Sequence, residues 1–280
     1  MRSRRTSTPY LEPSAPAEPM QSRPKIAWRW LLANFVQREI TSRYAGSASG
    51  LAWTIFNPLA QLAILALVFG TLLRVPQDML GGASFAAFLS VALWPWLMFN
   101  EGLRRAIESI PANAPLIRKV AFPHELLIYS AVASSFVVNL VGWVAVLLAL
   151  SLYGEPIRWA GLVLAVPLLA AQFAFTVGLS AALAAAQVVL RDVEHALGIA
   201  LSILFYATPI VYPLAVIPEP WHGWIALNPL AYMVGRYRDL VLGTAGVQWQ
   251  DFAVLAVSLL VLAAGIAAFR RISPYFEDLL

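Results

Sequence analysis

The chain has 280 residues, of which 60% are apolar and only 12% are charged, and its mean hydropathy is +0.72. Soluble domains carry roughly 25% charged residues, so the composition excludes a water-soluble protein and predicts an all-α integral membrane protein. The absence of cysteine excludes disulfides, thiolate nucleophiles and cysteine-ligated metal sites.

The N-terminal residues 1–25 contain five prolines among Ser, Thr and Arg residues. They lack an apolar run of the length that a signal peptide needs. We expect a disordered cytoplasmic tail.

Residues 26–45 are predicted to form an amphipathic interface helix on the inner membrane surface. Apolar residues recur at helical spacing and polar residues lie between them. The apolar positions are Trp28, Leu31, Leu32, Phe35, Val36 and Ile40. Two roles stay open, a simple anchor beside the first span and a lever between the membrane domain and a cytoplasmic partner.

The remaining residues, 46–280, are predicted to form a membrane domain with six spans. A helix needs about 20 apolar residues to cross the hydrocarbon core. Six stretches of about this length contain no Asp, Glu, Lys, Arg or His, and they cover 51–73, 80–100, 126–153, 159–190, 196–218 and 252–269. Proton-coupled and ion-coupled transporters usually keep an ionisable group inside a span, so we expect an energy source outside this chain.

Two prolines fall inside predicted spans, Pro58 in the first and Pro209 in the fifth. Each removes a backbone hydrogen bond and can kink its helix. The kink is interpreted either as a flexible point or as a static bend.

The basic residues give the orientation. With the N-terminus inside, 15 Lys and Arg residues fall on the inner side and four on the outer side. This asymmetry follows the positive-inside rule and predicts that both termini are cytoplasmic. The net charge of +4 therefore requires no nucleic acid partner.

Two connections are longer or more apolar than simple loops. The inner segment 101–125 mixes apolar and charged residues and is interpreted as a coupling loop that docks on another protein, or alternatively as a solvated connector. The outer segment 219–245 contains an apolar run, 220–235, that is too short and too interrupted by Gly223, Pro229 and Gly235 to span. It predicts a re-entrant helical hairpin between spans five and six.

Several kinds of chemistry are missing. Neither Lys25 nor Lys119 has the glycine and hydroxyl neighbours of a phosphate-binding loop. His124, His195 and His222 fall in three separate loops, so no metal site is expected. We therefore expect no catalytic residue and no cofactor bound by this chain, and a membrane-embedded transferase is disfavoured.

Several sequence blocks, in order along the predicted spans, resemble the ABC-2 type permeases for O-antigen, capsular polysaccharide and teichoic acid. The blocks are Tyr44-Ala45-Gly46-Ser47 with Gly50, Trp53 and Pro58, Val68-Phe69-Gly70, Ile117 to Pro123 with Glu125-Leu126, Arg191-Asp192-Val193, Thr208 to Tyr212, Asn228-Pro229 and Arg236-Tyr237-Arg238. The resemblance covers about 28–245, and the Arg191 block agrees best with the O-antigen branch.

The resemblance implies a homodimer in a bacterial inner membrane, bound to two separate ATPase subunits that carry ATP and magnesium. It implies a cargo of glycan linked to undecaprenyl diphosphate, with capsular polysaccharide, teichoic acid or a small-molecule drug as alternatives. It also implies a coupling surface and a periplasmic gate. The coupling residues are Leu116, Ile117, Arg118, Lys119, Phe122 and Pro123, and the gate residues are Trp221, Trp224, Asn228 and Pro229.

Aromatic side chains stack on sugar rings, but tryptophans also gather at membrane interfaces. The aromatics in spans that the family places at the dimer channel are Trp53, Phe56, Trp94, Trp96, Phe99, Phe205, Tyr206 and Tyr212. We expect these to line the channel, and we expect Arg38 or Arg43 to meet the lipid diphosphate headgroup.

Overall fold

The computed structural model describes residues 24–43, 50–72, 77–120 and 122–279. The predicted tail 1–25 falls almost wholly outside these residues, as do the last two residues of the predicted interface helix. Within the described residues the chain is helical and has no strand, which confirms the all-α prediction.

The described chain forms long helices joined by short turns. The long helices are α1 (Pro24–Ser42), α2 (Gly50–Leu65) with the π-helix η1 (Ala66–Leu72), α3 (Phe85–Ala112), α5 (Glu125–Leu152), α7 (Val166–Val189), α8 (Val193–Ala207), α10 (Pro229–Val241) and α11 (Trp249–Ile272). The short helices are η2 (Gln77–Leu80), α4 (Ala114–Ile117), α6 (Trp159–Leu164), η3 (Leu214–Val216), α9 (Glu219–Ala226), η4 (Ser273–Tyr275) and α12 (Phe276–Leu279).

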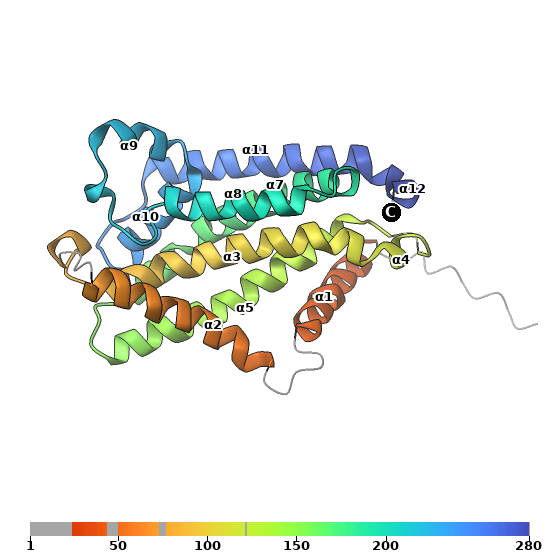
Figure 1. Ribbon diagram of the computed structural model, residues 1–280. Coiled ribbons are helices and arrows are strands. Elements are labelled where there is room, and N and C mark those ends of the chain that lie inside the picture. The colour runs from red at the N-terminus through yellow and green to blue at the C-terminus, as the bar shows by residue number, and fades with distance from the viewer. Residues whose placement is uncertain (1–23, 44–49, 73–76, 121, 280) are drawn as a thin grey trace, which may run out of the picture.

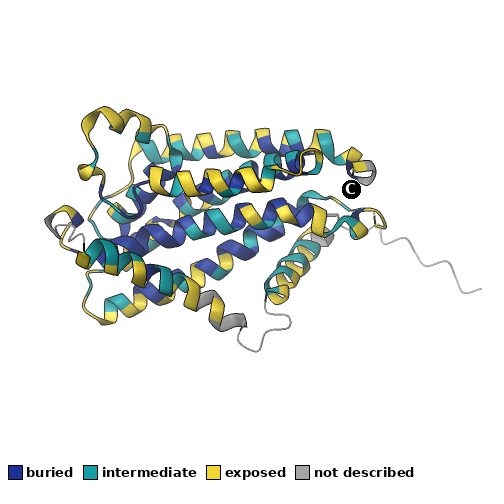
Figure 2. Ribbon diagram, viewed as in Figure 1, coloured by how far each residue is buried: buried dark blue, intermediate teal, exposed yellow. Residues whose placement is uncertain are grey.

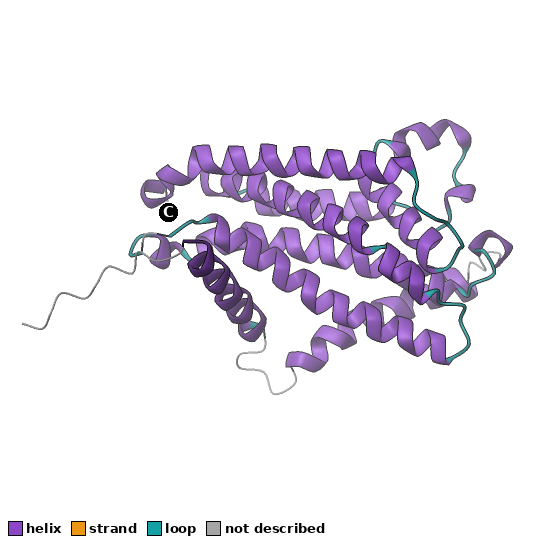
Figure 3. Cartoon of the chain, turned by 180° about the vertical axis from the view of Figure 1, so that it is seen from behind, coloured by secondary structure: helices purple, strands orange, loops and turns teal. Residues whose placement is uncertain are grey.

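The helix α3 lies at the centre of the bundle, where it contacts α2, α5, α7, α8 and α10. Figure 1 shows α3, α7, α8 and α11 running side by side, and α1 and α12 lie at the same end. Viewed from behind, the loops gather at the two ends of the bundle (Figure 3). Nearly every residue of α3 from Phe85 to Phe99 is buried (Figure 2).

The outer surface of the bundle is apolar. Large apolar side chains are exposed along α2, α5, α8 and α11, which fits a lipid environment rather than water. Three described helical segments are long and apolar enough to cross a membrane, Glu125–Leu152, Val166–Val189 and Trp249–Tyr275. Two shorter apolar segments, Phe56–Leu72 and Val193–Ala207, accompany them.

The helix that contains most of the predicted second span, 80–100, extends into the predicted coupling loop 101–125. The helix α3 continues to Ala112, so residues 101–112 are helical and only 113–124 connect α3 to α5. Leu103, Ile107 and Ile110 are buried at helical spacing, and Arg105 pairs with Glu101 one turn away. The charges that were taken to end the span are therefore paired along a continuing helix.

The predicted fifth span, 196–218, is only partly a continuous helix in the structure. The helix α8 ends at Ala207, and Thr208 is extended with φ −101° and ψ 133°. A residue that precedes proline is disfavoured in the α conformation, so Pro209 stops the helix and does not kink it. Pro58, by contrast, lies inside α2.

The helices α7 and α11 approach each other closely. A Cβ added at Gly265 would overlap the backbone of Gly178, and one added at Gly178 would overlap the backbone of Val261 and Leu262. The missing side chains thus allow backbone contact between the two helices, as small residues do in membrane bundles.

Candidate functional site

The helix α1 packs with one face on the bundle. Leu31, Leu32, Phe35, Val36 and Ile40 are half-buried, and the residues between them are mostly exposed. They are five of the six apolar positions that helical spacing had selected in the sequence, and the sixth, Trp28, is 37% exposed.

Two ring contacts join α1 to neighbouring segments. Trp28 meets Tyr129 of α5 with ring centroids 5.9 Å apart, and Phe35 stacks on Phe122 at 5.7 Å. Such aromatic pairs add to the stabilisation from apolar burial. The helix α1 is therefore attached to α5 and to the segment that precedes α5.

The predicted coupling residues divide into two groups. Arg118, Lys119 and Pro123 are exposed, whereas Ile117 is buried. Leu116 and Phe122 are half-buried. Arg118, Lys119 and Pro123 are thus accessible at the surface. The other three residues pack the segment against the rest of the bundle.

A series of rings continues from Phe122 toward the C-terminus. His124 contacts Phe122 at 5.2 Å and stacks on Phe276 at 5.9 Å, and Phe276 meets Phe269 at 5.3 Å. Sequence reasoning missed this series because its members are far apart in the chain. The segment that contains Phe122 and His124 is therefore attached both to α1 and to the C-terminal helices.

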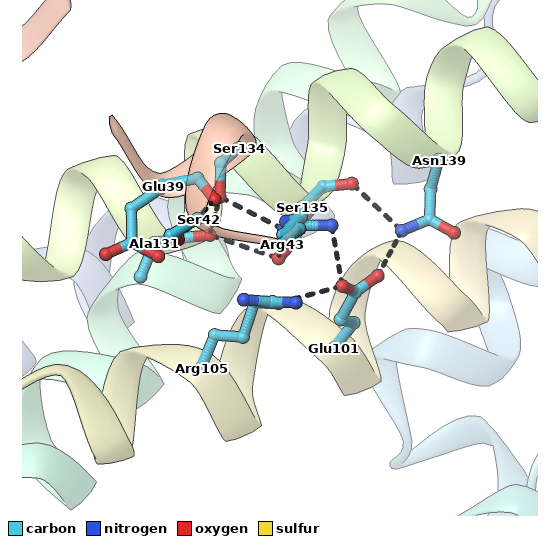
Figure 4. Close-up of polar contacts among 9 residues, drawn as sticks. All are labelled: Glu39, Ser42, Arg43, Glu101, Arg105, Ala131, Ser134, Ser135 and Asn139. Atoms are coloured by element: carbon cyan, nitrogen blue, oxygen red, sulfur yellow. Dashed lines mark hydrogen bonds and ion pairs between the residues drawn. The ribbon is translucent and has the colours of Figure 1, made fainter. Parts of the chain in front are cut away.

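A polar cluster joins α1 to α3 and α5 (Figure 4). Arg43 donates to Glu101 Oε1 at 2.7 Å and to the hydroxyls of Ser134 and Ser135 at 3.0 and 2.9 Å. Arg105 donates to the same Glu101 oxygen at 2.9 Å, and Asn139 donates to the other at 2.7 Å. We call these six residues the Arg43–Glu101 cluster.

The cluster changes the interpretation of the two headgroup candidates. The Arg43 side chain is only 3% exposed, so its guanidinium is engaged inside the chain and is not placed to meet a lipid headgroup. Arg38 is exposed and donates to Asn113 Oδ1 at 3.3 Å, which leaves it accessible at the surface.

The predicted channel aromatics lie in two different settings. Trp94, Trp96 and Phe99 of α3 are buried between helices of this chain, and Phe205 and Tyr212 are half-buried. Trp53, Phe56 and Tyr206 are exposed by 53%, 57% and 63%. Of the eight predicted channel aromatics, these three are the ones that are more than half exposed on this chain.

The predicted gate hairpin consists of an exposed helix and a buried one. Trp221 and Trp224 of α9 are 60% and 71% exposed, and α9 projects from the bundle in Figure 1. Asn228 caps α10 by accepting from Leu230 N at 3.0 Å and donates to Thr208 Oγ1 at 2.9 Å. Pro229 is the first residue of α10.

Two arginines of α10 hold the hairpin against the bundle, whereas the sequence analysis had used them only as outer-side charges and as part of the Arg236-Tyr237-Arg238 block. Arg236 bonds Asp251 at the start of α11, with contacts of 2.7 and 2.9 Å. Arg238 donates to the carbonyls of Phe88, Pro209 and Ile210 and lies 3.5 Å from the centroid of the Phe88 ring. Pro209 and Ile210 lie in the non-helical segment after α8, so their carbonyls need partners outside a helix, and Arg238 supplies them.

Known proteins are similar in sequence to this chain over most of its length. Residues 31–242 match the ABC-2 type transporter family. The O-antigen export system permease protein RfbA of Myxococcus xanthus is 31% identical over 255 residues, which cover 90% of this chain and 95% of the relative. A protein of the same name from Klebsiella pneumoniae is 28% identical over 254 residues, with 89% and 95% coverage.

A further relative bears a different name. The polysialic acid transport protein KpsM of Escherichia coli is 27% identical over 245 residues, which cover 83% of this chain and 90% of the relative. The match to the family covers most of the chain, including most of α1 and of the hairpin, and it confirms the resemblance found in the sequence. This chain belongs to the ABC-2 type transporter family.

Proposed function

We propose that this chain is the permease subunit of an ABC transporter that exports a polysaccharide linked to undecaprenyl diphosphate across a bacterial inner membrane. The observation that supports this most strongly is the nearly end-to-end similarity to permeases named for O-antigen export. An O-antigen-like cargo is preferred, since the relative named for polysialic acid transport is less similar. Capsular polysaccharide and teichoic acid remain the alternatives within the family.

The energy source is proposed to be a pair of separate ATPase subunits. ATP and magnesium would bind to those subunits and not to this chain. Arg118, Lys119 and Pro123 form an exposed group on a segment that stacks on α1 through Phe122. A partner that pushes on this segment would move α1 with it. These three residues are the proposed coupling surface.

The cargo path is proposed to lie between two copies of the chain. Trp53, Phe56 and Tyr206 are the predicted channel aromatics that face out of the protomer, and rings of this kind can stack on sugar faces. Trp94, Trp96 and Phe99 support these helices from inside the protomer.

Deletion of the gene for this chain tests the function. We expect the surface polysaccharide to disappear and the lipid-linked glycan to accumulate in the cytoplasm, with both reversed by the intact gene. A normal surface glycan after deletion would contradict the proposal and favour a small-molecule cargo.

The headgroup role is proposed for Arg38 alone. Arg38→Ala is expected to weaken the stimulation of ATP hydrolysis by the lipid-linked polymer, because a surface guanidinium that pairs with phosphate is lost. Arg29→Ala, which removes another exposed arginine of α1, is the matched control. Equal stimulation in the wild type and the Arg38 variant would exclude this role.

A further inference from the structure

A cavity of about 480 Å³ lies beneath α9, at the end of the bundle that the basic residues predict to be the outer one. Its walls come from η2, the start of α3, the segment after α8, and the helices α9 and α10. The volume falls within the range of roughly 300 to 1,000 Å³ that is usual for small-ligand pockets. Of the described residues that line the cavity, none is a predicted channel aromatic or a predicted gate residue.

The polar part of the lining includes Arg238. Its guanidinium lies 3.5 Å from the centroid of the Phe88 ring. Its Nε, Nη1 and Nη2 each donate to a main-chain carbonyl, at 3.2, 2.6 and 2.5 Å. A guanidinium has five N–H donors, so these carbonyls leave two of them for a group inside the cavity. Arg238 is thus a donor that the surrounding chain holds in place.

Asp239 adds an acceptor to the same lining. Its side chain is 56% exposed and lies 3.9 Å from Arg236 Nη1, so its carboxylate is accessible to a ligand. A cavity that presents one guanidinium and one carboxylate favours neither an anion nor a cation. Hydroxyl groups suit it, because a hydroxyl can accept from Arg238 and donate to Asp239.

The rest of the lining is largely apolar and includes Pro209, Pro213, Leu214 and Ile225. A sugar ring carries hydroxyls at its edge and apolar C–H groups on its faces, so it matches an apolar wall with a few convergent polar groups. The wall segment that begins at Pro209 directly follows α8, which carries the exposed Tyr206 of the proposed cargo path. The cavity therefore lies next to that path.

Gly235 leaves room in the cavity wall. It lies inside α10 and lines the cavity, and a Cβ built at this position meets no heavy atom within 4 Å. Glycine is unfavourable in the middle of a helix relative to alanine, and no close backbone contact requires it here. A larger side chain at this position can therefore fill the cavity without displacing its neighbours.

We propose that the cavity beneath α9 is a saccharide-binding site, which holds a short stretch of the polymer beside the outer end of the cargo path. Arg238 and Asp239 bind hydroxyl groups, and the apolar wall packs against the faces of the sugar rings. This inference rests on the proposed export function for the identity of the polymer.

The cysteine-free chain allows the cavity to be probed by chemical modification. Leu214 lines the cavity and is 45% exposed, so Leu214→Cys should react with a water-soluble maleimide. The full chain in lipid nanodiscs is treated with and without lipid-free oligosaccharides prepared from the surface polysaccharide of the host. We expect the oligosaccharides to slow the reaction. Tyr153→Cys, at an 89% exposed site outside the lining, should react at the same rate in both conditions.

Two glycine variants separate occupancy of the cavity from general effects on the hairpin. Gly235→Leu fills the cavity, so the oligosaccharides should no longer change the rate at Leu214→Cys. Gly223→Leu is the matched control, because a Cβ at Gly223 of α9 also meets nothing within 4 Å and Gly223 is outside the lining. The control should keep the protection that is seen without it. Protection that survives Gly235→Leu would overturn the proposal.

Two acidic residues test the polar contact. Asp239→Ala is expected to raise the oligosaccharide concentration for half-protection on the order of tenfold, because a hydrogen bond to a charged group is lost. Glu219→Ala removes an exposed carboxylate of α9 outside the lining and should leave that concentration unchanged. Equal shifts in the two variants would contradict the role of Asp239.

The remaining outcomes separate this site from the proposed function. Absence of protection by the oligosaccharides would overturn the site, even where the complex exports glycan. Protection by nanodisc phospholipid relative to detergent, with no further effect of the oligosaccharides, would identify a lipid site and also overturn it. Protection by the oligosaccharides without glycan export by the complex would refute the proposed function and leave the saccharide site standing.

Discussion

The helices α3 and α2 were both expected to carry channel aromatics, and the structure places them in opposite settings. The rings of α3 are buried among the neighbouring helices, whereas Trp53 and Phe56 of α2 are more than half exposed. Aromatic content alone therefore does not distinguish a channel surface from a packed core. Burial separates these aromatics into a packed scaffold on α3 and an outward surface on α2 and α8.

The largest difference in the free energy of unfolding is expected between alanine variants of Trp94 on α3 and Trp53 on α2. Trp94 is buried, and its Nε1 lies 2.8 Å from where a Cβ of Gly142 would be. Trp94→Ala should lower the free energy of unfolding by about 3 to 5 kcal/mol, the usual cost of emptying an aromatic core site. Thermal unfolding of the purified protein in detergent measures this.

Trp53→Ala is the matched change on the outward surface. It should alter the free energy of unfolding by no more than about 0.5 kcal/mol, as surface substitutions usually do, and it should reduce export. If the two tryptophan variants unfold at the same temperature, the division into scaffold and surface is wrong.

A smaller difference in stability is expected between alanine variants of two glycines, Gly265 and Gly198. Gly265→Ala would force apart the backbones of α7 and α11, and overpacking of this kind costs about 1 to 3 kcal/mol. Gly198→Ala on α8 would meet only Arg104 nitrogens at 3.8 and 3.9 Å, so it should be tolerated. Equal melting temperatures for the two alanine variants would show that the contact between α7 and α11 is not tight.

The smallest effect on stability is expected at the coupling surface. Replacing both Arg118 and Lys119 by alanine should change the free energy of unfolding by less than about 0.5 kcal/mol, because both are exposed. Binding of the ATPase subunits should weaken, which co-purification would detect. Undiminished co-purification would remove these two residues from the proposed coupling surface.

The sequence predicted the elements whose signals are local. The charge-free stretches 126–153 and 252–269 coincide closely with α5 and α11, and helical spacing identified the buried face of α1. The end of α3 was missed because Glu101 and Arg105 were counted as isolated charges, although they pair along one helix. The end of α8 was missed because a proline in an apolar run can either kink or stop a helix.

The contacts that organise the candidate sites could not be found in the same way. Arg43 and Glu101 are 58 positions apart, and Arg238 reaches carbonyls of Phe88 and Pro209 from another part of the chain. No spacing rule connects such residues, because their proximity depends on how the helices pack. Polar residues that lie just beyond an apolar run are nevertheless a usable signal, since inside a membrane protein they need partners.

The most direct test of the account is ATP-dependent transport of lipid-linked glycan by the purified complex in proteoliposomes. The account predicts that glycan reaches the far side only when this chain, the ATPase subunits and ATP are all present, and that Trp53→Ala reduces the rate. Transport without the ATPase subunits, or a complex that hydrolyses ATP and moves small amphiphiles but no glycan, would contradict it.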